Sequence, residues 1–582
     1  MISTIDGFWL PETLRSQVLT PGTTFVTASY ADGKPCQPED IGAVTARWPL
    51  LDKTQWQRLL DGLLENRSQA PGGEAFWTRL QRALQEVGKR FADPADSLVI
   101  RALATLPGYT GYSQAMVRFT LGALDLMAFD QFSKVFSQPA VMRTAREWQS
   151  MQGMPGWLRF YPSSLEQKAW TRIPGMGGRS LFGPLEIPEV VVGFGAGNVP
   201  GTALLIAMLA QATTLAGERL PAVVVKNSRQ EPIFTPLVFS ALEAVDPELL
   251  STVAVFVWDY EDDDIQSLLL SQADLVLAAA SDETIGQIQR QIDASSRQTG
   301  QRARFHAHGH KVSFAAISKE TLAHELQDPH TGNDLIDVVC LLAALDSAYW
   351  DQYGCLSARL HFYEEGGEGY YTALQYAERL EVQLRMLASA LPRGVSPRQP
   401  LMDQFDRFKL LEKTGEVKVL SRYEDPYVVA VDRRALSAQS FYTLVNGCLG
   451  RVVVVRPVKD LMEVPEHFLR MLPSANLQSL SLAAGSPGEV LPTRLLRFAE
   501  ACGARGVTAI RSLGRSAFPQ LAYSWDGLLP LDLVRSRPAG HFTTIEFDSP
   551  YEQMMETYNL FLKKAFANSS IHPFHGEKTE CV

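Results

Sequence analysis

The stretch PEVVVGFGAGNVPGTALLIAMLAQATTL (188–215) determines the fold class. It begins with a continuously apolar, β-branched run, passes through a turn rich in Gly at 193–201, and continues with the spacing of a buried helix. Further short apolar runs follow it, with amphipathic helical segments between them. These runs are PAVVVK (221–226), TVAVFVW (252–258), ADLVLAA (273–279) and KVSFAAI (311–317). Apolar strands that alternate with helices predict an α/β fold, in which helices cover both faces of a parallel sheet.

Ligands of such a sheet bind at the carboxyl ends of its strands. The rule directs attention to the turns at 193–201, 226–229, 258–264 and 280–283. The first turn contains G-x-G, but its next glycine does not complete G-x-G-x-x-G, so the dinucleotide-binding signal is weak.

Asn198 is the residue of interest in the first turn, and Ser281 in the last. The side-chain amide of Asn198 can donate to a developing oxyanion, although an asparagine in a turn is also explained by tolerance of positive φ. Ser281 precedes Asp282 and Glu283, which predicts an N-cap followed by an acidic first helical turn.

Helical patterns dominate the sequence before this region. Apolar residues recur at helical spacing over 54–67 and 74–91, and the pattern from about 100 to 150 also predicts helix. At the other end, the sequence after Ser536 is polar with few periodic features, and we expect partial disorder beyond Ala567.

Composition excludes several classes of protein. The chain has 582 residues and a formal net charge of −10, which argues against a nucleic-acid or anionic-membrane partner. No run of eighteen uncharged apolar residues occurs, and the N-terminus lacks the pattern of a secretory signal. Its six cysteines are scattered without a C-x-x-C pair, which fits neither a disulfide framework nor a zinc site and predicts a reducing cytoplasm.

Two of the cysteines have contrasting local settings. Cys355 follows Gly354 in WDQYGCLSARLHFY and precedes a strand-like segment, a setting that leaves its sulfur accessible. Cys340 lies inside the apolar helical pattern from Asp334 to Trp350, which predicts that it is a small residue of the core. A lone cysteine is more often a small buried residue than a nucleophile, so the residues alone leave both interpretations of Cys355 open. Its accessible setting makes Cys355 the candidate nucleophile, and Cys340 is the structural control.

Several motifs occur in one order along the chain. They are G-N-V-P-G (197–201), V-V-V-K-N-S-R-Q-E-P (223–232), the stretch from V-W-D to S-D-E-T-I (257–285), G-H-K-V-S-F (309–314), Q-x-x-C-L-S (352–357) and a segment ending S-W-D-G-L-L-P-L-D-L-V-R (506–535). Together they resemble the LuxC-type acyl-CoA reductases, a family within the aldehyde dehydrogenase superfamily. The resemblance covers about residues 95–536.

The resemblance implies roles for individual residues. Cys355 matches the nucleophile, Asn198 the oxyanion-binding asparagine of N-x-P, and Lys226 the lysine that binds the adenosine ribose of the cofactor. Three residues after that lysine, many NAD-using relatives have a glutamate, and this chain has Arg229. Because a guanidinium attracts a 2′-phosphate, we expect NADPH rather than NADH.

Further cofactor contacts are expected from the same turns. They are Gly197, Ser228, Trp258, Ser281 and Glu283. For Trp258 two interpretations stay open, because its ring could line the adenine pocket or simply pack in the core.

One departure from the superfamily bears on the reaction. Aldehyde-oxidising relatives have a water-activating glutamate in E-L-G-G-K, whereas residues 306–311 read H-A-H-G-H-K and contain no carboxylate. Without that base, an acyl-cysteine is not hydrolysed and remains available for reduction. His306, His308 and His310 alternate and could share one strand face; we expect no metal site, and consider His308 or His310 as a proton donor.

The resemblance thus implies an α/β, aldehyde-dehydrogenase-like fold in five parts. They are an N-terminal helical region of unknown role (1–95), a Rossmann-type cofactor-binding domain (96–305), an α/β catalytic domain (306–470), a segment returning to the α/β core (471–536) and a tail (537–582).

The expected function is NADPH-dependent reduction of a fatty acyl thioester, from acyl-CoA or acyl-carrier protein, to the aldehyde. We expect a cytoplasmic homo-oligomer, and a partner enzyme could deliver the acyl group. The alternatives are a CoA-acylating aldehyde dehydrogenase, an acyl-phosphate reductase, or a non-catalytic scaffold.

Overall fold

The computed structural model describes most of the chain. The described residues are 3–70, 72–123, 147–151, 153–163, 186–216, 219–259, 263–300, 302–328, 332–395, 399–520, 522–534 and 540–565. Within them, α4 (Ser97–Thr110) and α5 (Gln114–Ala123) match the first part of the helix expected from about 100 to 150. The rest of that prediction to residue 146, and the disorder expected beyond Ala567, lie outside the described residues. The last part of the predicted helix is wrong, because Gln149–Ser150 forms the short strand β5.

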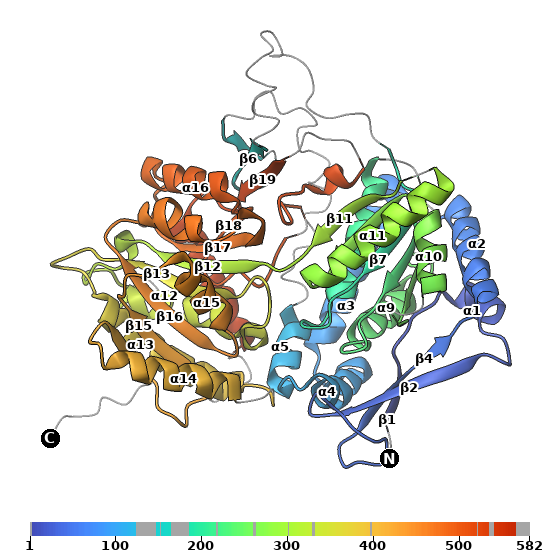
Figure 1. Cartoon of the computed structure of the whole chain (residues 1–582), viewed down its shortest axis with the longest axis horizontal. Helices are drawn as coiled ribbons and strands as arrows, with labels where there is room; N and C mark the ends of the chain where they lie inside the picture. The colour runs from blue at the N-terminus through green and yellow to red at the C-terminus, as the bar shows by residue number, and fades with distance from the viewer. Residues whose placement is uncertain are drawn as a thin grey trace, which may run out of the picture. The chain divides into compact units, whose positions relative to one another are not determined.

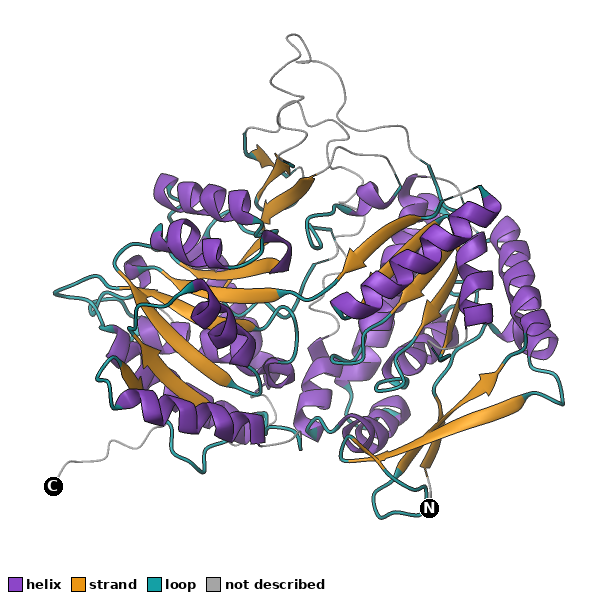
Figure 2. Cartoon of the chain, viewed as in Figure 1, coloured by secondary structure: helices purple, strands orange, loops and turns teal. Residues whose placement is uncertain are grey.

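The chain forms two compact units. Unit 1 consists of residues 1–117, 124–311 and 519–544, and unit 2 of residues 118–123, 312–518 and 545–582. Each unit has a sheet covered by helices, and Figures 1 and 2 show the elements of both.

The main sheet of unit 1 has five parallel strands in the order β11-β10-β7-β8-β9. They are β7 (Val190–Phe194), β8 (Ala222–Lys226), β9 (Val253–Phe256), β10 (Leu275–Ala279) and β11 (Arg304–His308). Four of the predicted apolar runs form β7 to β10, which confirms the parallel α/β prediction. In this sheet β8 lies on one side of β7 and β10 lies on the other, so the direction in which successive strands are added reverses at β7.

Helices cover both faces of this sheet. On one face, α2 (Lys53–Gln69), α10 (Asp263–Gln272) and α11 (Asp282–Thr299) contribute to a core cluster with alternate strand residues such as Val192 and Val224. Helices α10 and α11 run side by side over the strands in Figure 1. On the other face lie α8 (Thr202–Ala212) and, packed against it, α9 (Phe234–Val245).

The first fifty residues of unit 1 contain strands that the sequence did not predict. These are β1 (Ser3–Asp6), β2 (Thr24–Ala31), β3 (Lys34–Pro35) and β4 (Val44–Leu50), in the order β1-β4-β2-β3. The two helices expected in this region are present as α2 and as α3 (Gly73–Ala92). The N-terminal region is therefore mixed rather than helical.

Unit 2 contains seven strands of a second, ten-stranded sheet, in the order β14-β15-β16-β13-β12-β17-β18. The strands are β12 (Val312–Ile317), β13 (Ala358–Glu364), β14 (Val417–Val419), β15 (Val428–Asp432), β16 (Val452–Val458), β17 (Leu477–Ala483) and β18 (Ala509–Ser512). All pairs are parallel except β14 with β15. The helices are α12 (Leu335–Ala348), α13 (Ala373–Ala390), α14 (Gln399–Glu412), α15 (Ala438–Gly447) and α16 (Thr493–Arg505).

The C-terminal stretch also differs from its expectation. Instead of a tail without periodic structure, it contains β19 (Gly540–Ile545) and α17 (Pro550–Ala565). Met554 and Tyr558 of α17 are fully buried, so the helix packs into the core of unit 2 rather than extending into solvent. Among the described residues, no helix is long and apolar enough to cross a membrane.

Candidate active site

The turn after β7 lies where the strand order reverses, which is the position where open α/β sheets bind ligands. A Cβ on Gly197 would come within 2.2 Å of Ser228 Oγ, so only glycine lets this turn approach the segment after β8 so closely. The buried carboxylate of Glu231 joins the same segments, because it accepts from the backbone N–H of Phe234 (2.7 Å) and of Gly201 (3.4 Å). Burial raises the pKa of Glu231 to about 7.

Asn198 lies in this turn with an exposed side chain. Its φ is not positive, so the left-handed conformation that often explains an asparagine in a turn does not apply here. The hydroxyl of Tyr112 donates to the backbone carbonyl of Asn198 at 2.5 Å. The residue is therefore held through its backbone while its amide faces outward.

Lys226 ends β8 at the same edge of the sheet and is 5% exposed. Burial lowers the pKa of its ammonium to about 8, although the charge of Asp259 opposes the shift. The Nζ atom lies 5.7 Å from the ring centroid of Trp258. Trp258 itself packs edge-on against Trp56 in the core cluster, which favours the packing interpretation of that residue.

Arg229 is about half exposed and forms an ion pair with Asp259, with 2.5 Å between Nη2 and Oδ1. Asp259 follows Trp258 at the end of the next strand, and the sequence analysis did not select it. The cation expected to receive a phosphate therefore has a carboxylate partner in this structure. Because both side chains are solvated, the pair is weak and exchangeable.

Ser281 is confirmed as the N-cap of α11, and its hydroxyl accepts from the backbone N–H of Thr284. Asp282 and Glu283 occupy the first turn as predicted. Asp282 also accepts from the backbone N–H of His310 at 2.7 Å, which ties the segment after β11 to the start of the helix.

The three histidines of 306–311 have different surroundings. His308 is the last residue of β11 and is buried, with Nδ1 2.7 Å from Oδ2 of the equally buried Asp526. Its ring stacks on Trp525 with 3.9 Å between centroids. His310 lies beyond the strand and is exposed, so only His306 and His308 share the strand face proposed for all three.

Cys355 is confirmed as partly exposed, in contrast to Cys340, Cys448 and Cys502, which are buried. The thiol of Cys340 contacts the carbonyl of Tyr376, and burial raises its pKa well above the usual value. Cys581 lies outside the described residues. Among the described part of the chain, no group of three or more His, Cys, Asp or Glu is arranged to hold a metal ion.

The loop before Cys355 has an unusual backbone. Trp350, Asp351 and Gln352 all have positive φ, at 51°, 50° and 64°. For residues other than glycine this conformation costs about 1 to 3 kcal/mol each, so surrounding contacts must hold it. The buried amide of Gln352 does so by donating to the carbonyls of Ala358 and Val452 and accepting from the N–H of Val452.

A buried ion pair supplies the second restraint on this loop. Asp351 Oδ1 accepts from Arg451 Nε at 2.8 Å, and its Oδ2 accepts from the N–H of Gly394 at 2.9 Å. Arg451 is fully buried and also donates to the carbonyl of Leu391. Beyond the loop, the hydroxyl of Ser313 on β12 donates to the carbonyl of Cys355 at 2.8 Å. The backbone on both sides of the sulfur is therefore fixed.

The predicted site residues divide between the two units. Asn198, Lys226, Arg229 and His308 belong to unit 1, where the first three lie on the turns at the carboxyl edge of one sheet. Cys355 belongs to unit 2. The sequence analysis did not identify Asp526, Asp259 or the Asp351–Arg451 pair. Asp526 could have been selected from the sequence, because it belongs to the S-W-D-G motif at 524–527.

The chain matches the sequence model of one known family. The family model described as acyl-CoA reductase (LuxC) matches residues 188–536, which is more than half of the sequence. The chain belongs to this family. The matched region contains the candidate nucleophile, the oxyanion candidate and the His308–Asp526 pair. No curated protein sequence matches the chain.

Solved structures with the same fold are aldehyde dehydrogenases. A putative aldehyde dehydrogenase, PutA from Anabaena variabilis, has 14% identity and a TM-score of 0.50, over 90% of this chain and 98% of that one. A 1-pyrroline-5-carboxylate dehydrogenase from Thermus with bound NAD has 11% identity and a TM-score of 0.51, over 89% and 93%. A salicylaldehyde dehydrogenase from Pseudomonas putida G7 has 12% identity and a TM-score of 0.51, over 89% and 98%. At these identities the likeness shows that this LuxC-family chain has the aldehyde dehydrogenase fold.

The loop contacts predict a large effect of Asp351→Asn on stability. The substitution leaves the buried guanidinium of Arg451 without a charged partner, which should lower the free energy of unfolding by about 3 to 5 kcal/mol. Chemical denaturation followed by circular dichroism measures it. Asp406→Asn, on the exposed side of α14, is the control and should change little. Equal stability of the two variants would mean that the ion pair does not hold the loop.

Proposed function

We propose that this chain reduces a fatty acyl thioester, carried by CoA or by acyl-carrier protein, to the aldehyde with NADPH. In this proposal the acyl group is held on Cys355 during the reaction. The observation that carries it is the partly exposed sulfur of Cys355 on a loop that buried contacts hold in a strained conformation, in a chain of the LuxC acyl-CoA reductase family.

The covalent step balances as an acyl transfer. The thiolate of Cys355 attacks the carbonyl carbon of the incoming thioester, the carrier leaves as its thiolate, and the acyl group becomes a thioester of the enzyme. We assign stabilisation of the tetrahedral oxyanion to the amide of Asn198 and the backbone N–H of Cys355. The exposed amide of Asn198, on a turn fixed through its backbone, supports this role.

The sequence of residues 306–311 favours reduction over hydrolysis. Residues 306–311 contain no carboxylate to activate water, so the acyl-enzyme is expected to persist. In that segment we select His308 over His310 as the proton donor. The carboxylate of Asp526 orients the ring through Nδ1, which is the arrangement used for acid–base histidines.

The turns at the carboxyl edge of unit 1 fit a nicotinamide dinucleotide. Gly197 keeps the first turn tight against Ser228, and Lys226 places a buried cation at a strand end. We assign cofactor binding to these residues together with Arg229, Ser281 and Glu283, and leave Trp258 to the core. The bound nicotinamide supplies the hydride that takes the acyl group to the aldehyde level.

For the choice between NADPH and NADH, two side chains compete. Arg229 favours a 2′-phosphate, whereas Asp259 beside it would repel the phosphate and could accept from ribose hydroxyls instead. We propose NADPH, because the exposed ion pair breaks at little cost and frees the guanidinium for the phosphate.

Other parts of the proposal follow from the sequence alone. They are the cytoplasmic location, the homo-oligomer and a partner enzyme that delivers the acyl group. A CoA-acylating aldehyde dehydrogenase and an acyl-phosphate reductase use the same nucleophile and remain the alternatives within the superfamily. A non-catalytic scaffold would have no need of the strained loop at Cys355.

Cys355→Ala should abolish reduction while leaving the fold and cofactor binding intact, because the acyl group then has no sulfur with which to form a thioester. Incubation with radiolabelled acyl-CoA, without cofactor, measures the covalent step directly. Wild type and Cys340→Ala should be labelled alike. Label on Cys355→Ala would place the nucleophile elsewhere and overturn the proposal.

Asp526→Asn should reduce turnover by about ten- to a hundredfold without preventing acyl labelling, because it affects only the histidine that moves the proton. His467→Gln, at an exposed position in unit 2, is the control. Unchanged turnover would make the buried pair purely structural.

Arg229→Glu should weaken NADPH binding by about ten- to a hundredfold and leave NADH binding level or better, because the carboxylate repels the 2′-phosphate and accepts from ribose hydroxyls. Asp259→Asn is the matched variant and should strengthen NADPH binding, since it removes the competing charge. Fluorescence titration of each protein with each cofactor measures these effects. If wild type binds NADH as tightly as NADPH, the cofactor assignment is wrong.

A further inference from the structure

Cys355 is a central residue of a tight turn in unit 2. The turn runs from Gly354 to Ser357 and is closed by the backbone N–H of Ser357, which donates to the carbonyl of Gly354 at 3.2 Å. Gly354 and Ser357 are buried, whereas Cys355 and Leu356 between them are partly exposed. The peptide group that joins Gly354 to Cys355 carries the N–H to which we assigned part of the oxyanion site. The orientation of this turn therefore decides where that N–H points.

Two serine hydroxyls hold the carbonyl groups of the two exposed residues. Ser313 on β12 donates to the carbonyl of Cys355, and its oxygen accepts in turn from the hydroxyl of Ser479 on β17 at 2.8 Å. Ser516, in the segment after β18, donates to the carbonyl of Leu356. All three serines are buried, which strengthens these hydrogen bonds relative to bonds in water. Every peptide group of the turn is thus held by one hydrogen bond.

The side chain of Asp346 fixes the segment that carries Ser516. Asp346 lies near the end of α12 and is 1% exposed. Its Oδ1 accepts from the backbone N–H of Ser516 at 3.0 Å, and its Oδ2 accepts from that of Gly514 at 2.8 Å. Gly514 has φ of 85°, and a Cβ there would come within 2.7 Å of Leu342 on α12. Only glycine lets the segment approach the helix so closely.

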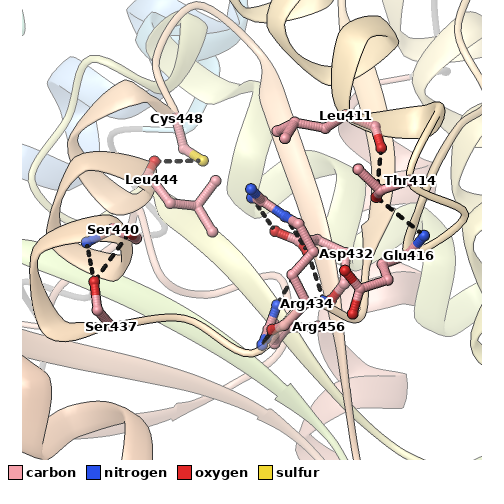
Figure 3. Close-up of polar contacts among 10 residues, drawn as sticks. All are labelled: Leu411, Thr414, Glu416, Asp432, Arg434, Ser437, Ser440, Leu444, Cys448 and Arg456. Carbon is pink, nitrogen blue, oxygen red and sulfur yellow. Dashed lines mark hydrogen bonds and ion pairs between the residues drawn. The ribbon is translucent and has the colours of Figure 1, made fainter.

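Asp346 uses its buried charge differently from another carboxylate of unit 2. Figure 3 shows Asp432 between Arg434 and Arg456, which both form ion pairs with it. Within the part of the chain that the structure describes, Asp346 forms no ion pair with an arginine. A buried carboxylate that relies on backbone N–H groups is stabilised only while the loop keeps its conformation. The carboxylate and the loop therefore restrain each other.

We propose that Asp346 and Ser516 are positioning residues that aim the backbone N–H of Cys355 at the oxyanion. The inference rests on the proposed role of Cys355 as the nucleophile. The carbonyl of Leu356 and the N–H of Ser357 belong to one peptide group, so the hydrogen bond from Ser516 also fixes the N–H that closes the turn. Without it the turn opens, and the N–H of Cys355 loses its direction. A misplaced donor stabilises the oxyanion poorly, although the sulfur stays accessible.

The test compares two reactions of the same sulfur. p-Nitrophenyl acetate acetylates the thiolate of Cys355 through a tetrahedral oxyanion and releases p-nitrophenolate, so this rate depends on the N–H donor. Iodoacetamide alkylates the thiolate by displacing iodide from carbon, and no oxyanion forms. Mass spectrometry of the peptide containing Cys355 measures both rates. Their ratio cancels changes in thiolate content and in exposure of the sulfur.

Ser516→Ala and Asp346→Asn should each lower the acetylation rate by about ten- to a hundredfold, because an oxyanion donor out of place loses most of its effect. The alkylation rate should barely change, because that reaction needs only the thiolate. Asparagine keeps the size of the side chain, but its single oxygen cannot accept from both N–H groups at their present positions. The double variant should fall no further than Ser516→Ala alone, because Asp346 acts through Ser516.

Two substitutions are matched controls. Asp337→Asn lies on the same helix as Asp346, but its carboxylate pairs with Arg379 on α13. Ser389→Ala removes an exposed hydroxyl from α13. Both controls should leave the ratio of the two rates unchanged.

The buried thiols of Cys340 and Cys448 report whether each variant is folded, since iodoacetamide reaches them only after unfolding. If Asp346→Asn exposes them, Ser516→Ala decides the question by itself. Ser516→Ala is the milder change, because it keeps the backbone N–H that donates to Asp346 and removes only one hydroxyl.

An unchanged ratio of the two rates in folded Ser516→Ala would overturn the inference. Labelling with acyl-CoA separates this failure from failure of the proposed function. If acyl-CoA labels Cys355 but the ratio ignores Ser516, the proposed function stands and the inference fails. If the ratio depends on Ser516 but acyl-CoA does not label Cys355, the turn is an oxyanion site and the proposed function fails.

Discussion

The left-handed backbone at 350–352 is the constraint on which the candidate nucleophile of unit 2, Cys355, depends. Three consecutive residues in this conformation would relax if the loop were solvated, because each is strained. The buried pair of Asp351 with Arg451 and the hydrogen bonds of Gln352 prevent that, and both connect the loop to the start of β16. The strain turns the chain between α12 and β13 so that Cys355 stays partly exposed while Gly354 and Ser357 are buried. A sulfur held this way reacts without first ordering a loop.

In unit 1 the comparable constraint is close packing at glycines. In GFGAGNVPG, a Cβ on Gly193 would meet Ile206, one on Gly195 would meet Ala203, and one on Gly197 would meet Ser228. Gly201 precedes α8 with φ of 89°. Each glycine is thus required either by close packing against another residue of the protein or by its backbone conformation. This explains why the stretch departs from the G-x-G-x-x-G spacing that phosphate contact requires. The turn is shaped by the chain itself, and in the proposed function the side chains of Asn198 and Lys226 provide its chemistry.

Sequence patterns predicted the parallel sheet of unit 1 and the exposure of Cys355, because both follow from residues close together in the chain. The N-terminal sheet was missed although Asp32–Gly33, with φ of 50° and 70°, has the D-G signature of a tight hairpin. Only Ser29 of its β2 strand is buried, and the strand carries no continuous apolar run. The partners of the site residues were beyond prediction for another reason. Asp526 is 218 positions from His308, and Arg451 is 100 from Asp351, so no local pattern relates them.

Solvation separates two arginine–aspartate pairs that lie beside candidate site residues. Arg229 is half exposed beside Asp259, so water screens the pair and either charge can exchange its partner for a ligand at little cost. A cofactor that binds and leaves in every turnover needs such an exchangeable contact. Arg451 and Asp351 are both buried, so separating them would leave an uncompensated charge away from water, and the pair stays closed. That arrangement suits a permanent restraint on the loop before Cys355. The degree of burial, more than the residue type, therefore decides which arginine can select a ligand and which one holds a loop.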